Sequence, residues 1–245
     1  MQRCPRFFTL LFLFALLFIS PIIMAGPVKH RSKPMRPFTA STNYIFKTSA
    51  SVLYDSLRLQ EFGLTEKAFK YALKGYKNLL EQGKLKTTGV MSICDFSQSS
   101  RHKRLYIINL DEMIVSMNTY VAHGRRSGGE FAYSFSNNPN SHKSSLGFYI
   151  TGQTYQGQHG LSLRINGLER GINDRALARN IVVHGSVYTG EEFLESNGVC
   201  GRSFGCPAVP STQIDEVINT IKEGTCLFIY YPSTQYLKKS KILNG

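Results

Sequence analysis

Short hydrophobic runs bounded by turn-forming residues dominate the chain from residue 88 onward. Runs of this kind, rich in β-branched and aromatic residues, are typical of β-strands. They predict strands over 90–96, 104–110, 113–121, 147–151, 160–165, 181–184 and 226–231, with a hairpin turn at Asp111 and Glu112. Several strands, glycine-rich connections and few helices predict a mainly β (α+β) fold, either a curved β-sandwich or a partly closed barrel.

Hydrophobic positions recur at helical spacing in three other places. The strongest case is 65–82, where Thr65 is placed to cap the first turn and Gly83 follows the last. A shorter helix is predicted over 50–62, so residues 47–86 form a helical segment that we expect to pack on the main domain. A late amphipathic helix is predicted over 211–222, because its isoleucines and valine form one apolar stripe.

The first 25 residues fit neither pattern. Two arginines precede an apolar run over 7–19, and residues 24–26 offer a small residue at a cleavage point. A charged start, a short apolar stretch and a small-residue site are typical of a secretory signal peptide. The apolar run is shorter than the ~20 residues of a membrane span, although an uncleaved anchor extended through residues 22–23 is the alternative. We therefore predict a signal peptide over 1–25 and an exported protein of the periplasm or cell wall.

Composition divides the remaining chain into a main domain and two basic flanks. Residues 26–46 hold three prolines, four Lys or Arg residues and a histidine, which predicts an extended basic linker. Residues 87–233 contain the predicted strands and form the main domain. Residues 234–245 are predicted to be a basic tail.

The charge balance narrows the choice of partner. The full chain carries a net charge of +13 at pH 7, and without residues 1–25 it keeps 27 basic and 16 acidic residues, or +11. Nucleic acid is the usual partner of such a basic chain. We predict no nucleic-acid partner here, because the protein is expected to leave the cytoplasm and its sequence has no recognisable nucleic-acid-binding module. An anionic wall polymer or membrane surface fits better. A solvated basic surface with no particular partner is the alternative.

The stretch from 181 to 209 concentrates the candidate chemistry. A β-branched strand leads to His184 and a turn at Gly185, and Cys206 follows 22 residues after the histidine. A free thiol has a pKa of about 8.5 and is a poor nucleophile while it is protonated. A neighbouring imidazole can accept its proton and return it to a leaving amine. The pattern predicts Cys206 as nucleophile and His184 as base, with the ring oriented by a backbone carbonyl such as that of Gly185.

The residues just before the cysteine predict a tight loop. Gly205 allows the chain to turn without a Cβ in the way, and such a turn would aim the N–H groups of Phe204, Gly205 and Cys206 at one point. A donor aimed at a developing oxyanion is typically worth about 3 kcal/mol of barrier. Ser203 is expected to support this loop by a hydrogen bond rather than to act as a nucleophile.

His-Gly followed by Ser-x-Gly-Cys resembles the signature of the L,D-transpeptidases, cysteine enzymes that remodel peptidoglycan. The likeness is strongest with the murein L,D-transpeptidase catalytic-domain branch, which has Gly-Arg-Ser-x-Gly-Cys-Pro-Ala at this place. Segments at 120–124, 135–137, 144–151 and 159–164 are also similar to that branch, so the resemblance spans roughly 91–231. Phe204 stands where the better-known branch has a histidine, and any substrate contact of that imidazole does not carry over.

The resemblance implies a β-rich fold of the L,D-transpeptidase type, with the main domain as its catalytic domain. It implies that Cys206 attacks a peptidoglycan stem tetrapeptide, forms a thioester as D-alanine leaves, and passes the acyl group to an amine. No metal or organic cofactor is needed, and acylation by carbapenems is expected. Two alternatives stay open: an L,D-carboxypeptidase, if water is the acceptor, and a non-catalytic murein-binding protein, if the site is degenerate.

Two further residues near the signature have two interpretations each. Arg202 either clamps a substrate carboxylate in bidentate fashion or braces the loop. Tyr188, four residues after the histidine, either lines the site or packs in the core.

The other cysteines and histidines have mainly structural interpretations. Cys94 and Cys226 lie in apolar strands as small buried hydrophobes, and a disulfide is the alternative in an oxidising compartment. For Cys200, a bridge to the proposed nucleophile or a shared zinc site is a weaker hypothesis, because structural zinc needs four ligands at tighter spacing. His123 and His159 are expected to have structural or groove-lining roles.

Overall fold

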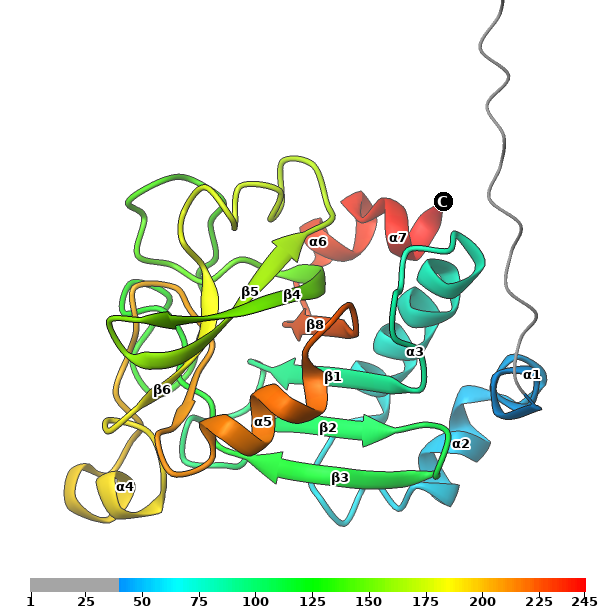
Figure 1. The fold of residues 1–245 in the computed structure, drawn as a ribbon, viewed down its shortest axis with the longest axis horizontal. Helices are drawn as coiled ribbons and strands as arrows, with labels where there is room; N and C mark the ends of the chain where they lie inside the picture. The colour runs from blue at the N-terminus through cyan, green and yellow to red at the C-terminus, as the bar shows by residue number, and fades with distance from the viewer. Residues whose placement is uncertain (1–39) are drawn as a thin grey trace, which may run out of the picture. The chain divides into compact units, whose positions relative to one another are not determined.

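A single sheet organises the chain in a computed structural model that describes residues 40–245 (Figure 1). The predicted signal peptide and the first part of the predicted linker lie outside the described residues. Eight strands form the sheet within the described part: β1 (Val90–Asp95), β2 (Leu105–Asn109), β3 (Ile114–Thr119), β4 (Gly147–Gly157), β5 (Gly160–Gly167), β6 (Val182–Ser186), β7 (Ala208–Pro210) and β8 (Cys226–Tyr230). Their order across the sheet is β3-β2-β1-β8-β4-β5-β6-β7.

The two edges of this sheet approach each other. β1 pairs with β8, and β6 with β7, in parallel, whereas the other neighbours are antiparallel. The chain leaving edge strand β3 runs to the opposite edge, where Ala122 N–H donates to Ala208 O at 2.8 Å and Gly124 bridges Ser203. The sheet is therefore nearly closed into a barrel, which confirms the predicted mainly β (α+β) class.

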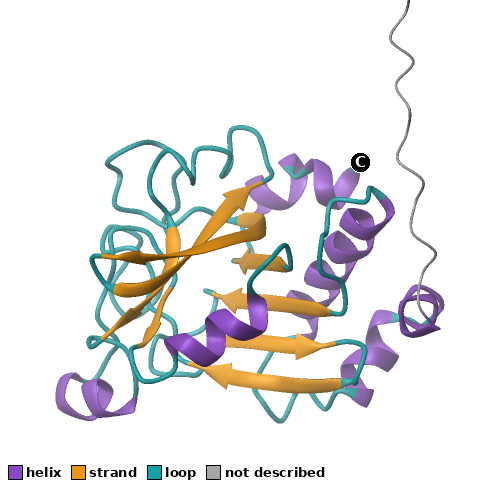
Figure 2. Cartoon of the chain, in the orientation of Figure 1, coloured by secondary structure: helices purple, strands orange, loops and turns teal. Residues whose placement is uncertain are grey.

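Helices cover the middle of the sheet. Successive residues of β1 and β8 are buried, so both faces of these strands are covered. Helices α3 (Glu66–Glu81) and α5 (Ile214–Ile221) both pack against β1, as Figure 2 shows around the central strands. Gly75 permits the close approach of α3, because a Cβ there would lie 2.0 Å from the Phe148 ring on β4. Thr65 Oγ1 accepts the N–H of Ala68 at 3.3 Å and caps α3 as predicted.

Both basic flanks contain helices that the sequence analysis did not predict. Helix α1 (Ala40–Lys47) covers the end of the range 26–46 that was assigned to an extended linker, whereas α2 (Ala50–Ser56) lies where a helix was predicted. Helices α6 (Thr234–Lys239) and α7 (Lys241–Asn244) replace the predicted basic tail. They are part of the domain because Asn78 of α3 donates to Ile242 O at 2.6 Å and the buried Glu169 carboxylate accepts from Tyr236 and Ser240.

Several element boundaries also differ from the prediction. Strand β4 continues to Gly157, six residues past its predicted end, because it forms a long exposed hairpin with β5. Neither β7 nor the short helix α4 (Glu191–Asn197) was predicted. Helices α2 and α5 are shorter than their predicted ranges.

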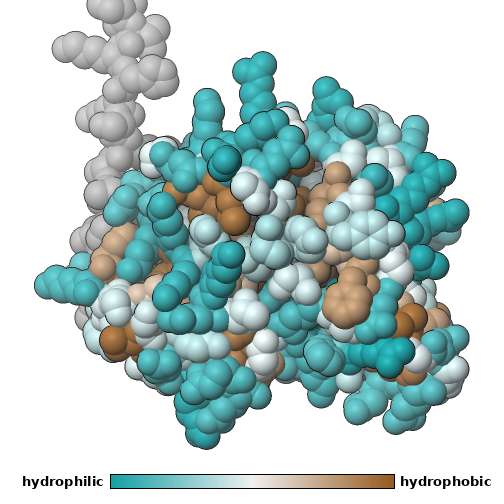
Figure 3. Space-filling view, turned by 180° about the vertical axis from the view of Figure 1, so that it is seen from behind, coloured by the Kyte–Doolittle hydropathy of each residue, from teal (hydrophilic) through white to brown (hydrophobic). Residues whose placement is uncertain are grey.

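The face of the molecule seen in Figure 3 is mostly hydrophilic. On the face seen in Figure 3, hydrophobic residues reach the surface only in separate patches among polar ones. Within residues 40–245, none of the helices is long and apolar enough to cross a bilayer.

Candidate active site

His184 lies in the middle of β6, with a relative exposure of 4%. Its ring Nδ1 is 2.9 Å from Gly185 O, the carbonyl that the sequence analysis expected to orient it. A carbonyl oxygen only accepts, so Nδ1 carries the proton of the neutral ring and Nε2 is left as the basic nitrogen. The histidine is therefore held in the tautomer that a general base requires.

A second histidine covers this ring. His159, in the turn between β4 and β5, stacks on His184 with ring centroids 4.5 Å apart and planes 21° from parallel. Burial lowers the pKa of His184, His159 lowers it further, and the hydrogen bond to Gly185 opposes both effects. From the sequence, His159 was expected to have only a structural or groove-lining role. The predicted strands were too short to show that the β4–β5 hairpin carries His159 to His184.

The cysteine loop enters β7 directly beside His184. His184 pairs with Ala208 across the parallel ladder, and its N–H donates to Pro207 O at 3.4 Å. Cys206 precedes that proline. The structure thus brings the predicted base and the predicted nucleophile onto adjacent segments at one edge of the sheet.

Ser203 holds the loop closed. Its Oγ accepts the N–H of Gly205 at 3.0 Å and donates to Cys206 O at 2.7 Å. The Gly205 N–H is therefore engaged inside the loop, which corrects the expectation that it points with Phe204 and Cys206 at a substrate oxygen. Gly205 acts as a loop support instead.

Only glycine fits at this place in the loop. Gly205 has a φ of +127°, and a Cβ there would lie 2.7 Å from Lys143 O. Ser144 Oγ donates to Gly205 O at 3.1 Å and accepts the Gly124 N–H at 3.0 Å. The cysteine loop is thus packed tightly against two other loops, whose backbones define its shape.

The thiol of Cys206 is half-buried and donates to Asn180 O at 3.6 Å. Asn180 has a φ of +54°, a left-handed conformation that asparagine tolerates better than most residues. Burial raises the pKa of the Cys206 thiol, whereas the backbone of Val182 and the charge of Arg179 lower it. Burial therefore disfavours the thiolate form of Cys206, and the nearby charge of Arg179 favours it.

Arg179 is a site residue that the sequence analysis missed. Its guanidinium donates to Ser136 O at 2.8 Å and to Lys143 O at 2.5 Å, and it also binds the hydroxyls of Ser141 and Ser145. These bonds tie the segment before β6 to residues 136–145 and fix a positive charge beside the cysteine loop, where a terminal nitrogen of Arg179 lies 3.3 Å from the place a Cβ on Gly205 would occupy. In the sequence, only its position just before the strand of His184 could have pointed to Arg179 as a site residue. One arginine among several in a loop gives no specific prediction.

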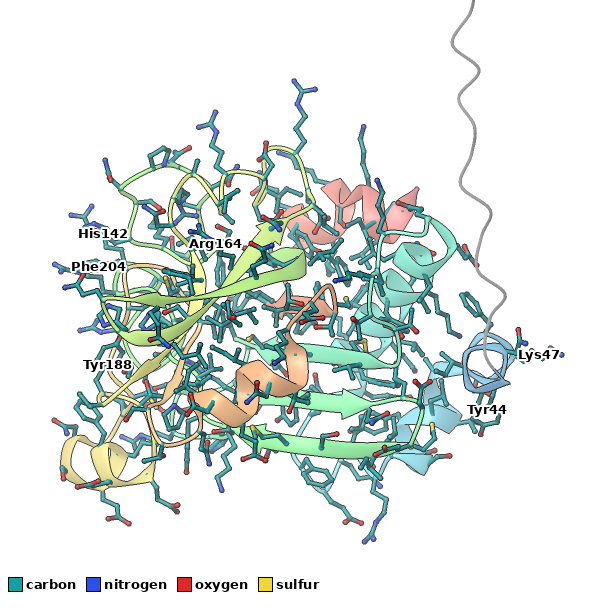
Figure 4. All side chains as sticks on the ribbon, in the orientation of Figure 1. Tyr44, Lys47, His142, Arg164, Tyr188 and Phe204 are labelled. Atoms are coloured by element: carbon teal, nitrogen blue, oxygen red, sulfur yellow. The ribbon has the colours of Figure 1, made fainter. Side chains whose placement is uncertain are left out.

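Phe204 projects from the loop with a relative exposure of 61%. His142 lies against its ring at a centroid distance of 4.6 Å, and the guanidinium of Arg125 lies 5.2 Å from the ring centre. Figure 4 shows Phe204 beside His142 and on the same side of the molecule as Tyr188. An imidazole thus contacts the position where the better-known branch has its histidine, but it comes from a different loop.

The structure bears differently on the two interpretations of Arg202 and on those of Tyr188. Arg202 donates to Gly128 O at 3.1 Å, so it braces the loop. Tyr188 is half-buried, and its pKa is raised by burial first and by the charge of Cys206 among other causes. The Tyr188 side chain packs against Gly201, where a Cβ would lie 2.6 Å from it, so both interpretations of Tyr188 stay open.

The cysteines within residues 40–245 form no disulfide bridges. Cys94, Cys200, Cys206 and Cys226 are all free thiols, which corrects the alternatives of a disulfide between Cys94 and Cys226 or between Cys200 and Cys206. Among the described residues, no cluster of His, Cys, Asp and Glu has the arrangement of a metal site. His123 is buried, and its Nδ1 lies 2.8 Å from a terminal guanidinium nitrogen of Arg104, which is a structural contact.

The fold is a nearly closed mixed sheet that carries a cysteine loop and a histidine strand at one edge. Comparisons with known proteins show which family has this arrangement. The family model described as the L,D-transpeptidase catalytic domain matches residues 60–230. The chain belongs to this family, which confirms the resemblance noted in the sequence. A comparison with curated proteins finds no match.

Solved structures with a similar fold include three L,D-transpeptidases at low sequence identity. One from Mycobacterium smegmatis has 10% identity and a TM-score of 0.36, with 58% of this chain and 59% of that chain covered. One from Xylanimonas cellulosilytica has 14% identity and a TM-score of 0.33, with 75% and 94% covered. L,D-transpeptidase 3 from Mycobacterium tuberculosis, in complex with a faropenem-derived adduct, has 12% identity and a TM-score of 0.36, with 58% and 60% covered. This chain therefore spans about three fifths of the M. smegmatis and M. tuberculosis chains.

Proposed function

We propose that this protein is an exported peptidoglycan L,D-transpeptidase that uses Cys206 as its nucleophile. Membership in a family of cell-wall enzymes supports the choice of substrate. The position of the cysteine loop beside His184 supports the choice of residues.

The proposed reaction begins with proton transfer. Nε2 of His184 takes the thiol proton, since Nδ1 is committed to Gly185 O. The thiolate of Cys206 attacks the carbonyl of the L-configured centre of the diamino acid in a stem tetrapeptide. The carbon–nitrogen bond to D-alanine breaks, His184 gives its proton to the leaving amine, and a thioester remains on the protein.

The second half of the reaction reverses the first with a new amine. An amine from a neighbouring stem attacks the thioester, loses its proton to His184 and forms an amide, while the carbon–sulfur bond breaks. Arg179 stabilises the thiolate by its charge. The N–H of Gly205 is bonded to Ser203, so the proposal assigns the oxyanion to the N–H groups of Phe204 and Cys206.

The single observation that carries the proposal is the pairing of His184 with the segment that follows Cys206, combined with a fixed tautomer. Incubation with purified disaccharide tetrapeptides, followed by mass spectrometry of the products, tests it. We expect cross-linked dimers and free D-alanine from the wild type and unchanged substrate from Cys206→Ala. Tripeptides without dimers would identify water as the acceptor, and bound but unchanged substrate would identify a non-catalytic binding protein. Either result would overturn the proposal of a transpeptidase.

A further inference from the structure

A cavity of about 380 Å³ opens between the loop 133–137, the turn at 171–172 and the segment entering α6. Its volume lies within the range of about 300–1,000 Å³ typical of small-ligand sites. None of the proposed reacting groups lines it. The cavity is therefore a concave site distinct from the proposed reacting groups.

Aromatic rings form much of its wall. Phe135 and Tyr231 contact each other with centroids 5.1 Å apart and planes inclined by 45°. Tyr133 stands beside them with a relative exposure of 69%, and Leu146 and Ile172 add apolar surface. Large aromatic rings left in water around a cavity offer flat apolar faces to a ligand.

The polar part of the lining is almost neutral. Ser134, Asn137, Ser233 and Gln235 contribute hydroxyl and amide groups, and Lys239 is the one charged residue among the described residues that line the cavity. Hydroxyls and amides both donate and accept hydrogen bonds. Aromatic faces with neutral hydrogen-bonding groups match a pyranose ring, which has an apolar face of C–H groups and an edge of hydroxyl and acetamido groups.

The cavity shares a wall with the cysteine loop. Ser136, which lines it, accepts a hydrogen bond from Arg179 at 2.8 Å. The other terminal nitrogen of Arg179 lies 3.3 Å from the place a Cβ on Gly205 would occupy. One guanidinium therefore separates the aromatic cavity from the loop of Cys206.

We propose that this cavity binds the sugar backbone of the polymer whose peptide reaches Cys206. The identity of the polymer rests on the proposed function, but the preference for a neutral amino-sugar rests on the lining alone. A sugar held here limits the positions that its attached peptide can reach, so the cavity selects polymer-bound stems over free peptides.

The test is calorimetric titration of the full-length protein with the peptide-free tetramer of N-acetylglucosamine. Tyr133→Ala should weaken binding about tenfold, as expected for the loss of one stacking aromatic, and Tyr133→Phe should retain it. Tyr44→Ala is the matched control, because Tyr44 is also an exposed tyrosine, at 48%, and lies on α1.

Two results would overturn the inference: no binding of the tetramer, or equal binding by Tyr133→Ala and wild type. Acylation of Cys206 by a carbapenem, measured on the same samples, separates this inference from the proposed function. Acylation without sugar binding would refute the sugar site alone. Sugar binding without acylation would refute the proposed chemistry alone.

Discussion

Replacement of Ser203 by alanine tests whether the cysteine loop is held by the hydroxyl group identified here. The substitution removes an acceptor from the buried Gly205 N–H and a donor from Cys206 O. A buried group left without a partner costs about 1–3 kcal/mol, whereas water can reach the half-exposed Cys206 segment. We therefore expect a loss of about 2 kcal/mol in the free energy of unfolding. For a domain of this size that corresponds to about 4–8 °C in Tm.

The same substitution should slow the chemistry of the thiol. A displacement of about 1 Å at a reacting group can cost about 100-fold in rate, so we expect carbapenem acylation of Cys206 to fall by about 10- to 100-fold in Ser203→Ala. Ser203→Thr keeps the hydroxyl and should retain most of the rate. Ser196→Ala is the matched control, because that serine lies on the exposed helix α4 and bonds only to Glu192 O. Wild-type stability and an unchanged acylation rate in Ser203→Ala would refute the assigned role of the hydroxyl.

Three further predictions concern packing and titration. Gly75→Ala places a Cβ 2.0 Å from the Phe148 ring and should lower the free energy of unfolding by about 1–3 kcal/mol, as measured by urea titration; an unchanged midpoint would contradict the packing described. His159→Ala removes a neighbour that lowers the pKa of His184 and uncovers its ring, so the acidic limb of the pH–rate profile should move to higher pH, and a limb that stays in place would exclude the stacking role. Burial lowers the pKa of His123 to about 3 in the folded protein, whereas an unfolded histidine has a pKa of about 6.5. Folding with a neutral His123 therefore costs nothing above a pH of about 6.5, and the free energy of unfolding falls by about 1.4 kcal/mol per pH unit as the pH drops from there towards 3. His123→Asn should flatten this part of the Tm–pH curve, and an equal slope in both proteins would contradict it.

The sequence predicts the strands of this fold well where a hydrophobic face is buried. β1, β2 and β8 lie within the predicted ranges because consecutive buried residues give long apolar runs. The outer part of β4 was missed because polar and glycine residues dominate a hairpin exposed to water. β7 was missed because three residues that end at Pro210 are too few for a pattern.

The helical flanks show where composition is misleading. Lysines made residues 234–245 resemble a tail, yet Tyr236, Ile242 and Leu243 are buried. Their spacing spans two very short helices, so no single period is visible. The position of these helices depends instead on a contact between distant residues, because Glu169, 67 residues from Tyr236 in the chain, accepts a hydrogen bond from the Tyr236 hydroxyl.

The candidate site was predictable in its residue types but not in its contacts. His184, Cys206 and Ser203 stand out because a strand, a glycine turn and a cysteine occur close together in the chain. Contacts across the barrel do not appear in a single sequence. The stacking of His159 on His184, and the clamp that Arg179 forms on the loop 136–145, depend on how distant segments pair.

Intact-mass spectrometry after incubation with a carbapenem, and separately with a disaccharide tetrapeptide, tests the central claim most directly. We expect one covalent adduct per chain in the wild type and in Cys200→Ala, with the tetrapeptide adduct lacking the mass of D-alanine. Cys206→Ala should show none. An adduct that persists in Cys206→Ala, or a wild-type protein that stays unmodified by both reagents, would contradict the assignment of Cys206 as the nucleophile.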